Sequence, residues 1–344
     1  MVFKDVLSSL LELQDLTQSE MLDVMRQVMG GELTSAQISA FLIALRAKGE
    51  TVDEIAAAAM VMRELSTKVD IKETRHLIDT CGTGGDGIQT FNVSTVCAFV
   101  AAAAGAKVAK HGGRSVSSTC GSADVLEALG VNVNQTSAQV GECVNEIGIG
   151  FMFAPNHHSA MKHAAPVRRE LGVRTLFNLL GPMTNPATAR RQVMGVFDKT
   201  LTVKLAKVLH QLGSEHVLVV HGADGMDEIS FTGDTYVAEL KNGQVTEYAL
   251  NPSQFGLEIH SLKDIQIKNA EESKAMILDV LNGKPSNEKS RAARDIVLMN
   301  AGAAIYVAGI TSSLQAGIEK AAEVIDNGAA LKKLNQLIER SNQG

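Results

Sequence analysis

Residues 82–87, Gly-Thr-Gly-Gly-Asp-Gly, follow an apolar run that ends at Cys81 and have the composition of a phosphate-binding loop. Glycine has no Cβ and adopts positive φ without cost, so the backbone N–H groups of such a loop can approach a phosphate closely. The segment also matches G-x-G-x-x-G, but a dinucleotide site is disfavoured. The next helix is expected only near Asn92, and no acidic residue stands about 20 positions on. No Gly-Lys-Ser/Thr follows, so this is not a P-loop. A glycine-rich turn without a ligand is the alternative.

Three further segments carry cations and hydroxyls that suit the same kind of ligand. Residues 92–95, Asn-Val-Ser-Thr, stand where a helix is expected to begin; their oxygens can cap that helix or help to hold an anion or its metal. Residues 110–118 form a loop with a lysine, an arginine and several serines, all of which donate hydrogen bonds to phosphate. Ser122 opens the next helix as a cap or a phosphate donor. A solvated loop is the competing interpretation of residues 110–118.

Two segments raise the question of a metal. His157, His158 and His163 fall within seven residues, but their spacing does not fit a zinc site, so we expect them to belong to a cationic helix that lines an anionic pocket. Asp227 and Glu228 are adjacent carboxylates after an expected strand. They can both face one hard cation, and Mg²⁺ is commonly held by one or two carboxylates together with substrate phosphates. A solvated acidic turn is the alternative.

An α/β domain must position these segments, because ligands of open α/β sheets lie at loops after the carboxyl ends of strands. Residues 1–66 are predicted to be helices only, with capping boxes at Thr17/Glu20 and Thr51/Glu54. Thereafter short apolar runs alternate with helical segments, which predicts a largely parallel sheet. Strands are expected at 76–81, 107–110, 150–153, 193–197 and 216–221, and helices at 93–104, 123–129, 138–147 and 201–212. Residues 236–240 and 244–248 flank Asn242-Gly243, a strong hairpin signal.

Composition excludes several classes of protein. The 344 residues contain 32 Lys and Arg against 38 Asp and Glu, a net charge of −6, with no Trp and three Tyr, which opposes a nucleic-acid surface. The length suggests about two domains. The longest apolar stretches, 95–106 and 296–310, are too short to span a membrane, and the N-terminal run does not resemble a secretory signal. Four cysteines without C-x-x-C spacing are expected to be thiols of a cytoplasmic protein.

Seven motifs occur together in one order: Gly82-Thr-Gly-Gly-Asp86, Asn92-Val-Ser-Thr95, Lys110-His-Gly-Gly-Arg114, Gly121-Ser-Ala-Asp124, Val167-Arg-Arg-Glu170, residues 177–186 (Phe-Asn-Leu-Leu-Gly-Pro-Met-Thr-Asn-Pro) and Asp227-Glu228. This series resembles the anthranilate phosphoribosyltransferase family over nearly the whole chain. The resemblance implies a small N-terminal helical domain, residues 1–70, joined by helices around 158–185. It also implies a large α/β domain, residues 71–344, with a mostly parallel central sheet of the nucleoside phosphorylase/phosphoribosyltransferase type. A homodimer without nucleic-acid or membrane partners is expected.

The resemblance also implies a reaction and its residues. The 5-phosphoribosyl group of 5-phosphoribosyl 1-diphosphate would pass to the amino group of anthranilate, giving N-(5-phosphoribosyl)anthranilate and diphosphate in tryptophan biosynthesis. The donor would be bound by Gly82, Gly85, Asp86, Thr90, Asn92, Ser94, Thr95, Lys110, His111, Gly112, Gly113, Arg114, Ser117, Ser118 and Ser122. Anthranilate would contact Gly82, Gly113 and Arg168, with Arg168 on its carboxylate. Ser94, Asp227 and Glu228 would serve the Mg²⁺ cofactor.

The chain departs from the family pattern at Gly113, where the family usually has an Asn that contacts anthranilate. Ser159, in place of a common Pro, and Thr119-Cys120, in place of Lys-Ser, are milder departures. Two alternatives stay open. A pyrimidine nucleoside phosphorylase also uses a glycine-rich loop and a Lys-His pair, but needs no paired-carboxylate Mg²⁺ site. A homologue that has lost catalysis would be a binding protein.

Overall fold

The computed structural model describes residues 2–114 and 119–343. Its α-helices are α1 (Phe3–Leu11), α2 (Gln18–Gly30), α3 (Ser35–Lys48), α4 (Val52–Glu64), α5 (Val93–Ala103), α6 (Ser122–Ala128), α7 (Ser137–Ile147), α8 (Ala154–His157), α9 (Ala165–Leu171), α10 (Phe177–Leu180), α11 (Leu201–Gln211), α12 (Ala270–Leu281), α13 (Glu288–Val307), α14 (Leu314–Asp326) and α15 (Ala329–Asn342). Short 3₁₀ helices are η1 (Ser159–Lys162), η2 (Gly181–Met183), η3 (Pro252–Phe255) and η4 (Leu262–Asp264). The strands are β1 (Leu77–Ile78), β2 (Lys107–Gly112), β3 (Ile149–Phe153), β4 (Arg191–Gly195), β5 (His216–Gly222), β6 (Thr235–Lys241) and β7 (Gln244–Leu250).

The strands form two sheets that meet at β1. In the first sheet, β1, β2 and β3 run parallel in that order, and in the second β4 and β5 are parallel while β5, β6 and β7 are antiparallel. A parallel bridge between Asp79 and Gln192 connects β1 to β4. The carboxyl ends of β1, β4 and β5 therefore open toward the same edge. The expected mostly parallel α/β domain is confirmed, and the hairpin turns at Asn242-Gly243 as predicted.

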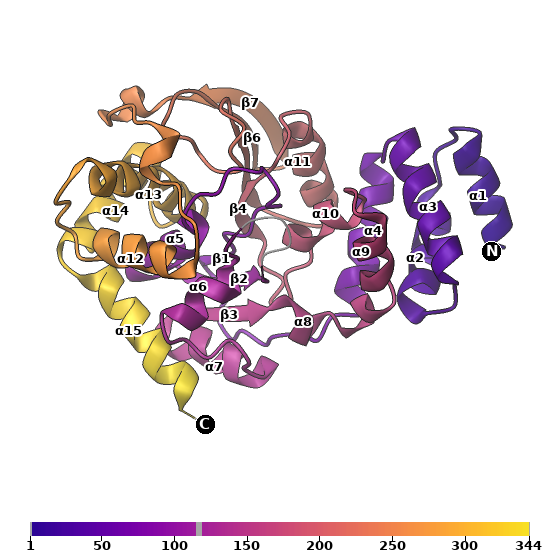
Figure 1. The fold of residues 1–344 in the computed structure, drawn as a ribbon, viewed down its shortest axis with the longest axis horizontal. Helices are drawn as coiled ribbons and strands as arrows, with labels where there is room; N and C mark the ends of the chain where they lie inside the picture. Colours follow the sequence, from indigo (N-terminus) through magenta and orange to yellow (C-terminus); the bar gives the residue numbers. More distant parts are fainter. Residues whose placement is uncertain (1, 115–118, 344) are drawn as a thin grey trace.

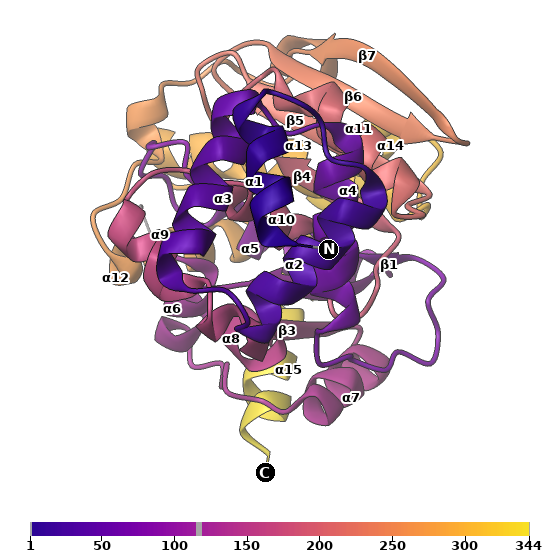
Figure 2. The ribbon, with the colours of Figure 1, turned by 90° about the vertical axis from the view of Figure 1, so that its right-hand side faces the viewer.

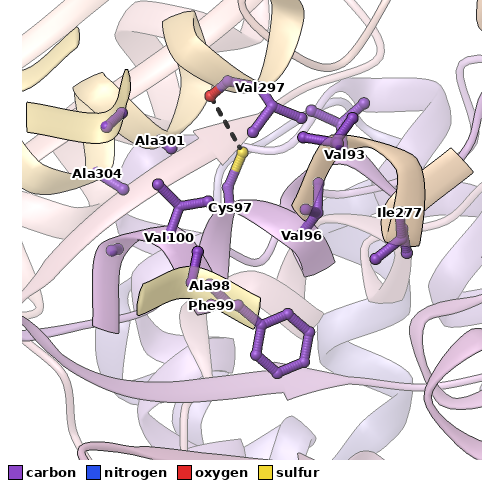
Figure 3. Close-up of a cluster of buried hydrophobic side chains, with 14 of the residues drawn as sticks. Val93, Val96, Cys97, Ala98, Phe99, Val100, Ile277, Val297, Ala301 and Ala304 are labelled. Atoms are coloured by element: carbon purple, nitrogen blue, oxygen red, sulfur yellow. Dashed lines mark hydrogen bonds between the residues drawn. The ribbon is translucent and has the colours of Figure 1, made fainter. Parts of the chain in front are cut away.

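The core of the α/β domain is formed by two apolar helices from distant parts of the sequence. Helix α5 is almost completely buried, because most of its side chains are those of Val, Ala, Cys and Phe. It packs against α13, as Figure 3 shows, and the Cys97 thiol donates to the carbonyl of Val297 at 3.7 Å. Within α13, the buried Asn300 accepts from the backbone of Ile229 at 2.8 Å and donates back to its carbonyl at 2.8 Å. This pair fixes the segment that carries Asp227 and Glu228.

Helices α1–α4 form a bundle at one end of the molecule, beside α9 (Figure 1), and in Figure 2 the bundle faces the viewer in front of the strands. Both predicted capping boxes are confirmed: Thr17 and Thr51 accept from the backbone of Glu20 and Glu54, whose carboxylates accept from the threonine N–H groups. Helix α9 contacts α3, and α10 contacts α4. Apolar side chains from 164–180 thus share a core with the bundle although they are distant in sequence.

Element boundaries mostly agree with the sequence expectations. The strand expected at 76–81 is reduced to two residues, because Asp79 and the residues after it leave the ladder to form the site described below. Among the described residues, no helix combines the length and apolar character needed to cross a membrane.

Candidate active site

The glycine-rich loop at 82–87 is held against the end of β4 and against the Asp227 segment. The N–H of Thr83 donates to the carbonyl of Gly195 at 2.9 Å, and the N–H of Gly84 donates to Asp227 Oδ2 at 2.8 Å. Gly195 permits this close approach, because a Cβ there would lie 1.4 Å from the Asp227 carbonyl oxygen. Gly84, Gly85 and Gly87 all have positive φ. Among the described residues, the N–H groups of residues 85–87 have no hydrogen-bond partner, so they are available to an anion.

Three carboxylates converge beside this loop. Asp86 Oδ2 accepts from the Asp227 N–H at 3.4 Å, and Glu228 Oε1 accepts from the Ser94 N–H at 3.2 Å, at the first turn of α5. Burial raises the pKa of Asp227, and the nearby Asp86 charge adds to the effect. Burial likewise raises the pKa of Glu228 well above its usual range, with Asp227 contributing and Lys110 opposing. Like charges held this close favour protonation or a bound cation, and hard oxygen ligands suit Mg²⁺.

Lys110 brings a positive charge into the same place from β2. Its side chain is buried, and Nζ donates to Ser94 Oγ at 3.2 Å and to the carbonyl and hydroxyl of Thr80 at 3.3 Å each. All three acceptors are neutral, so none of these hydrogen bonds is an ion pair. The structure therefore brings together Lys110, Ser94, Asp86, Asp227 and Glu228, all of them singled out in the sequence.

The start of α5 is built differently from a simple helix cap. Asn92 makes no side-chain cap; its Nδ2 donates to the Cys120 carbonyl at 3.1 Å and its Oδ1 accepts from Ser273 Oγ at 2.7 Å. The Thr95 hydroxyl is buried with no partner among the described residues. Thr90 forms an isolated bridge with Gln266. Asn92 therefore joins α5 to α12 and to the second loop, and Thr95 leaves an unsatisfied hydroxyl beside the ligand-binding turn.

The second loop begins where β2 ends. The N–H of His111 donates to Asp79 Oδ1 at 3.2 Å, and Ser122 Oγ donates to the Gly113 carbonyl at 3.3 Å. Arg114 pairs with Asp124 at 2.9 Å and with Glu127 at 2.6 Å, so its guanidinium contacts α6 in this structure. The predicted donor-binding residues Ser117 and Ser118 lie outside the described part of the chain.

Arg168 occupies a different wall, on α9. Its side chain has no hydrogen bond or ion pair to another described residue, and its guanidinium carbon lies 5.4 Å from the centre of the Phe177 ring. Burial lowers the pKa of Arg168. An arginine that is partly desolvated and unpaired is suited to bind a carboxylate from a ligand.

The three histidines before α9 diverge and do not share one ligand position. His157 bonds the Thr67 carbonyl through Nδ1 at 3.0 Å, His158 meets the His111 ring edge-on at a centroid distance of 5.1 Å, and His163 lies against Gly31. Burial lowers the pKa of His111 to about 3 and that of His158 to about 4, and the neighbouring histidines add to both shifts. The Nε2 atoms of His111 and His158 are buried without a partner among the described residues. Burial also lowers the pKa of His157, so His157 and His158 favour the neutral form and add no positive charge to the expected cationic lining.

Two site residues escaped the sequence argument. Arg174 donates through Nη2 to the carbonyl of Gly85, and its guanidinium stacks on Phe197 with 4.0 Å from Cζ to the ring centre. Asp79, buried at the end of β1, accepts from Asn185 Nδ2 at 2.7 Å as well as from His111, and burial raises its pKa to about 6. Neither residue stands in a motif that marks its partner, since each acts across more than 30 positions of sequence.

Comparison with known proteins gives a consistent result over both parts of the chain. The model of a family described as "Glycosyl transferase family, helical bundle domain" matches residues 4–66, and that of "Glycosyl transferase family, a/b domain" matches residues 74–331. An anthranilate phosphoribosyltransferase of Methylobacillus flagellatus is 64% identical over 334 residues, covering 97% of this chain and 96% of the relative. That of Laribacter hongkongensis is 59% identical over 340 residues, covering 99% and 98%.

Solved structures agree with the sequence relatives. The anthranilate phosphoribosyltransferase of Thermus thermophilus superposes with a TM-score of 0.91 at 42% identity, covering 98% of this chain and 99% of that one. The Saccharomyces cerevisiae enzyme in complex with PRPP and Mg gives a TM-score of 0.90 at 30% identity, covering 99% and 98%.

Proposed function

The chain belongs to the glycosyl transferase family that contains the anthranilate phosphoribosyltransferases, and from this premise we propose how its residues carry out that family's reaction. The enzyme transfers the 5-phosphoribosyl group of 5-phosphoribosyl 1-diphosphate to the amino group of anthranilate, in tryptophan biosynthesis. N-(5-phosphoribosyl)anthranilate and diphosphate are the products. The observation that carries the proposal is a pair of hydrogen bonds: Asp227 accepts from the N–H of Gly84, and Glu228 accepts from the N–H of Ser94. These bonds connect the carboxylate pair to both proposed anion-binding segments.

We place the diphosphate of the donor on the glycine-rich loop. Its N–H groups at 85–87, which have no partner among the described residues, and the Lys110 ammonium offer positive charge at fixed positions. The hydroxyls of Thr90, Ser94 and Thr95 and the remaining predicted residues, Gly82, Asn92, His111, Gly112, Gly113, Arg114, Ser117, Ser118 and Ser122, complete the proposed donor site. Arg114 would have to leave Asp124 and Glu127 to reach the donor.

We propose that Mg²⁺ binds to Asp227, Glu228 and Ser94, whose oxygen atoms suit that ion. The oxygens are hard ligands, and a bound cation would offset the repulsion between the buried carboxylates, which contributes to the raised pKa of each. Asp86 lies close enough to Asp227 to add a further carboxylate. When bound, Mg²⁺ would neutralise charge on the departing diphosphate.

Bond cleavage at the anomeric carbon leaves oxocarbenium-like charge on the ribose, so the site must stabilise the leaving group and position the acceptor. The loop N–H groups and Lys110 are suited to the first task. Arg168, with Gly82 and Gly113, would hold anthranilate by its carboxylate and aim the amine at the ribose. The amine of anthranilate is already neutral at pH 7, so the reaction needs no strong base, and the neutral histidines nearby are compatible with that requirement.

The test is a fluorescence assay of anthranilate consumption with 5-phosphoribosyl 1-diphosphate, with and without Mg²⁺. Mg²⁺-dependent turnover is expected. Absence of turnover at high anthranilate would leave the non-catalytic alternative, a binding protein, as the better account. The pyrimidine nucleoside phosphorylase alternative predicts phosphorolysis of uridine instead, and the paired carboxylates count against it.

The finer points of organisation are also proposals. We divide the chain into a helical domain, residues 1–70 with the helices at 158–185, and an α/β domain, residues 71–344. Leu11 at the end of α1, Leu13 just after it and Ile43 on α3 are exposed apolar residues of two helices that contact each other, and they support a homodimer. Sedimentation of the wild type and of Leu11→Asp would show loss of the dimer only in the variant. The reducing cytoplasm is the proposed compartment, consistent with four cysteines that form no disulfide among the described residues.

A further inference from the structure

Arg174 contacts both the helical bundle and the glycine-rich loop. It lies between α9 and α10, in the segment that packs on the helical bundle, and its backbone carbonyl accepts from Nη1 of Arg46 on α3. Its own guanidinium reaches the other way, where Nη2 donates to the carbonyl of Gly85 in the glycine-rich loop. One residue therefore links the bundle to the loop.

The surface of the α/β domain that Arg174 contacts is formed by Phe197 and the glycine-rich loop. Phe197, just after β4, presents its ring to the guanidinium at 4.0 Å, and its N–H donates to Thr83 Oγ1 at 3.3 Å. The first half of the loop is thus anchored by Thr83 to β4 and by Gly84 to Asp227. Gly85 is held by Arg174, from the helical side.

The bond to Gly85 matters because of peptide geometry. The carbonyl of Gly85 and the N–H of Asp86 belong to one planar trans peptide, so they point in opposite directions. Gly85 has a φ of +79°, and because glycine has no Cβ its ψ can change at little steric cost, which lets the 85–86 peptide rotate. The Arg174 hydrogen bond that fixes the Gly85 carbonyl on one side of this peptide therefore fixes the Asp86 N–H on the other side. That N–H is one of the amides that have no partner among the described residues.

We propose that Arg174 is a positioning residue. When the segment between α9 and α10 packs against the α/β domain, Arg174 orients the 85–86 peptide toward the diphosphate of the donor. The inference rests on the proposed function. Arg174 follows Arg168, the proposed acceptor-binding residue, by six positions in the sequence.

The experiment compares Arg174→Ala and Arg174→Lys with Arg169→Ala, a matched control that removes an exposed arginine of α9. Steady-state kinetics and titration with Mg²⁺ plus diphosphate are measured for each. We expect Arg174→Ala to raise the KM for the donor and the dissociation constant of Mg²⁺-diphosphate about tenfold, the effect of losing one charge-assisted hydrogen bond. Its KM for anthranilate should change less than twofold at saturating donor. Arg174→Lys should recover only part, because an ammonium cannot stack and donate as the planar guanidinium does.

A second variant separates positioning from general damage to the fold. Phe197→Leu removes the stacking ring but keeps the backbone donor to Thr83, so its effect on donor KM should overlap with that of Arg174→Ala instead of adding to it. Unchanged donor KM and diphosphate affinity in Arg174→Ala would overturn the inference, and so would equal losses for both substrates. A wild type that neither turns over nor binds Mg²⁺-diphosphate would overturn the proposed function instead.

Discussion

The backbone N–H of Gly84 donates to Asp227 Oδ2 at 2.8 Å across 143 positions of sequence. This contact makes the glycine-rich loop and the carboxylate pair a single unit. A change at Asp227 is therefore expected to disturb two things, the charge that would hold a cation and the shape of the loop that would hold a phosphate.

Replacing both carboxylates, as Asp227→Ala with Glu228→Ala, should abolish Mg²⁺-dependent turnover while the protein stays folded. Removing one preorganised electrostatic group from a site typically costs about 10²–10³ in rate, and the double variant loses the whole pair. Burial raises the pKa of both carboxyls, so their removal relieves an unfavourable charge cluster, and the thermal midpoint should not fall. The assay is anthranilate fluorescence over a Mg²⁺ series, beside circular dichroism. Full activity would refute the metal assignment.

Gly113→Asn should lower the KM for anthranilate. A Cβ at Gly113 meets nothing within 4 Å, so the family's common side chain can be accommodated. Gly112→Ala is the matched contrast, because its Cβ would lie 2.2 Å from Ser122 Oγ and 3.0 Å from the Phe151 ring. We expect Gly112→Ala to lose stability by about 1–3 kcal/mol, as overpacking does. An unchanged KM in Gly113→Asn would show that another residue orients the acceptor.

Arg168→Gln should raise the KM for anthranilate about tenfold or more and leave the donor KM nearly unchanged. The guanidinium has no ion pair within the described chain, so its removal breaks no structural contact of that kind. A hydrogen bond to a charged group contributes about 1.5–3 kcal/mol, which sets the scale of the loss. Arg169→Gln, on the exposed side of the same helix, is the control. If both variants behaved alike, Arg168 would not be the carboxylate partner.

His158 should make the protein less stable in mild acid. Burial lowers its pKa from 6.5 to about 4, so the folded chain keeps the ring neutral while the unfolded chain protonates it. Between these values the unfolded state binds more protons, and the unfolding free energy therefore falls as the pH falls from about 6.5 to about 4. The contribution of this group is about 3 kcal/mol at the acid end.

The measurement is urea unfolding from pH 7 to pH 4.5 for the wild type and His158→Phe, which keeps a ring beside His111 but does not titrate. The variant should lose less stability on acidification, whatever its stability at pH 7. His210→Phe, at an exposed position of α11, should follow the wild type. Parallel pH curves for wild type and His158→Phe would contradict the assignment.

The local sequence was sufficient for most of the elements. The capping boxes at Thr17 and Thr51, the hairpin at Asn242-Gly243 and the carboxylate pair were all predicted, because each depends on residues a few positions apart. The family resemblance added the reaction, which the comparisons support.

Only the tertiary structure decided which partners these groups have. In the folded chain the Arg114 guanidinium pairs with Asp124 and Glu127, and Asn92 hydrogen-bonds Ser273 instead of capping the helix. Burial lowers the pKa values of His111 and His158, which favours their neutral forms. The tertiary structure also brought Arg174 to Gly85. Partner choice and burial depend on packing between segments up to 181 positions apart, as in the Asn92–Ser273 contact, and no local pattern of residue types encodes such a distance.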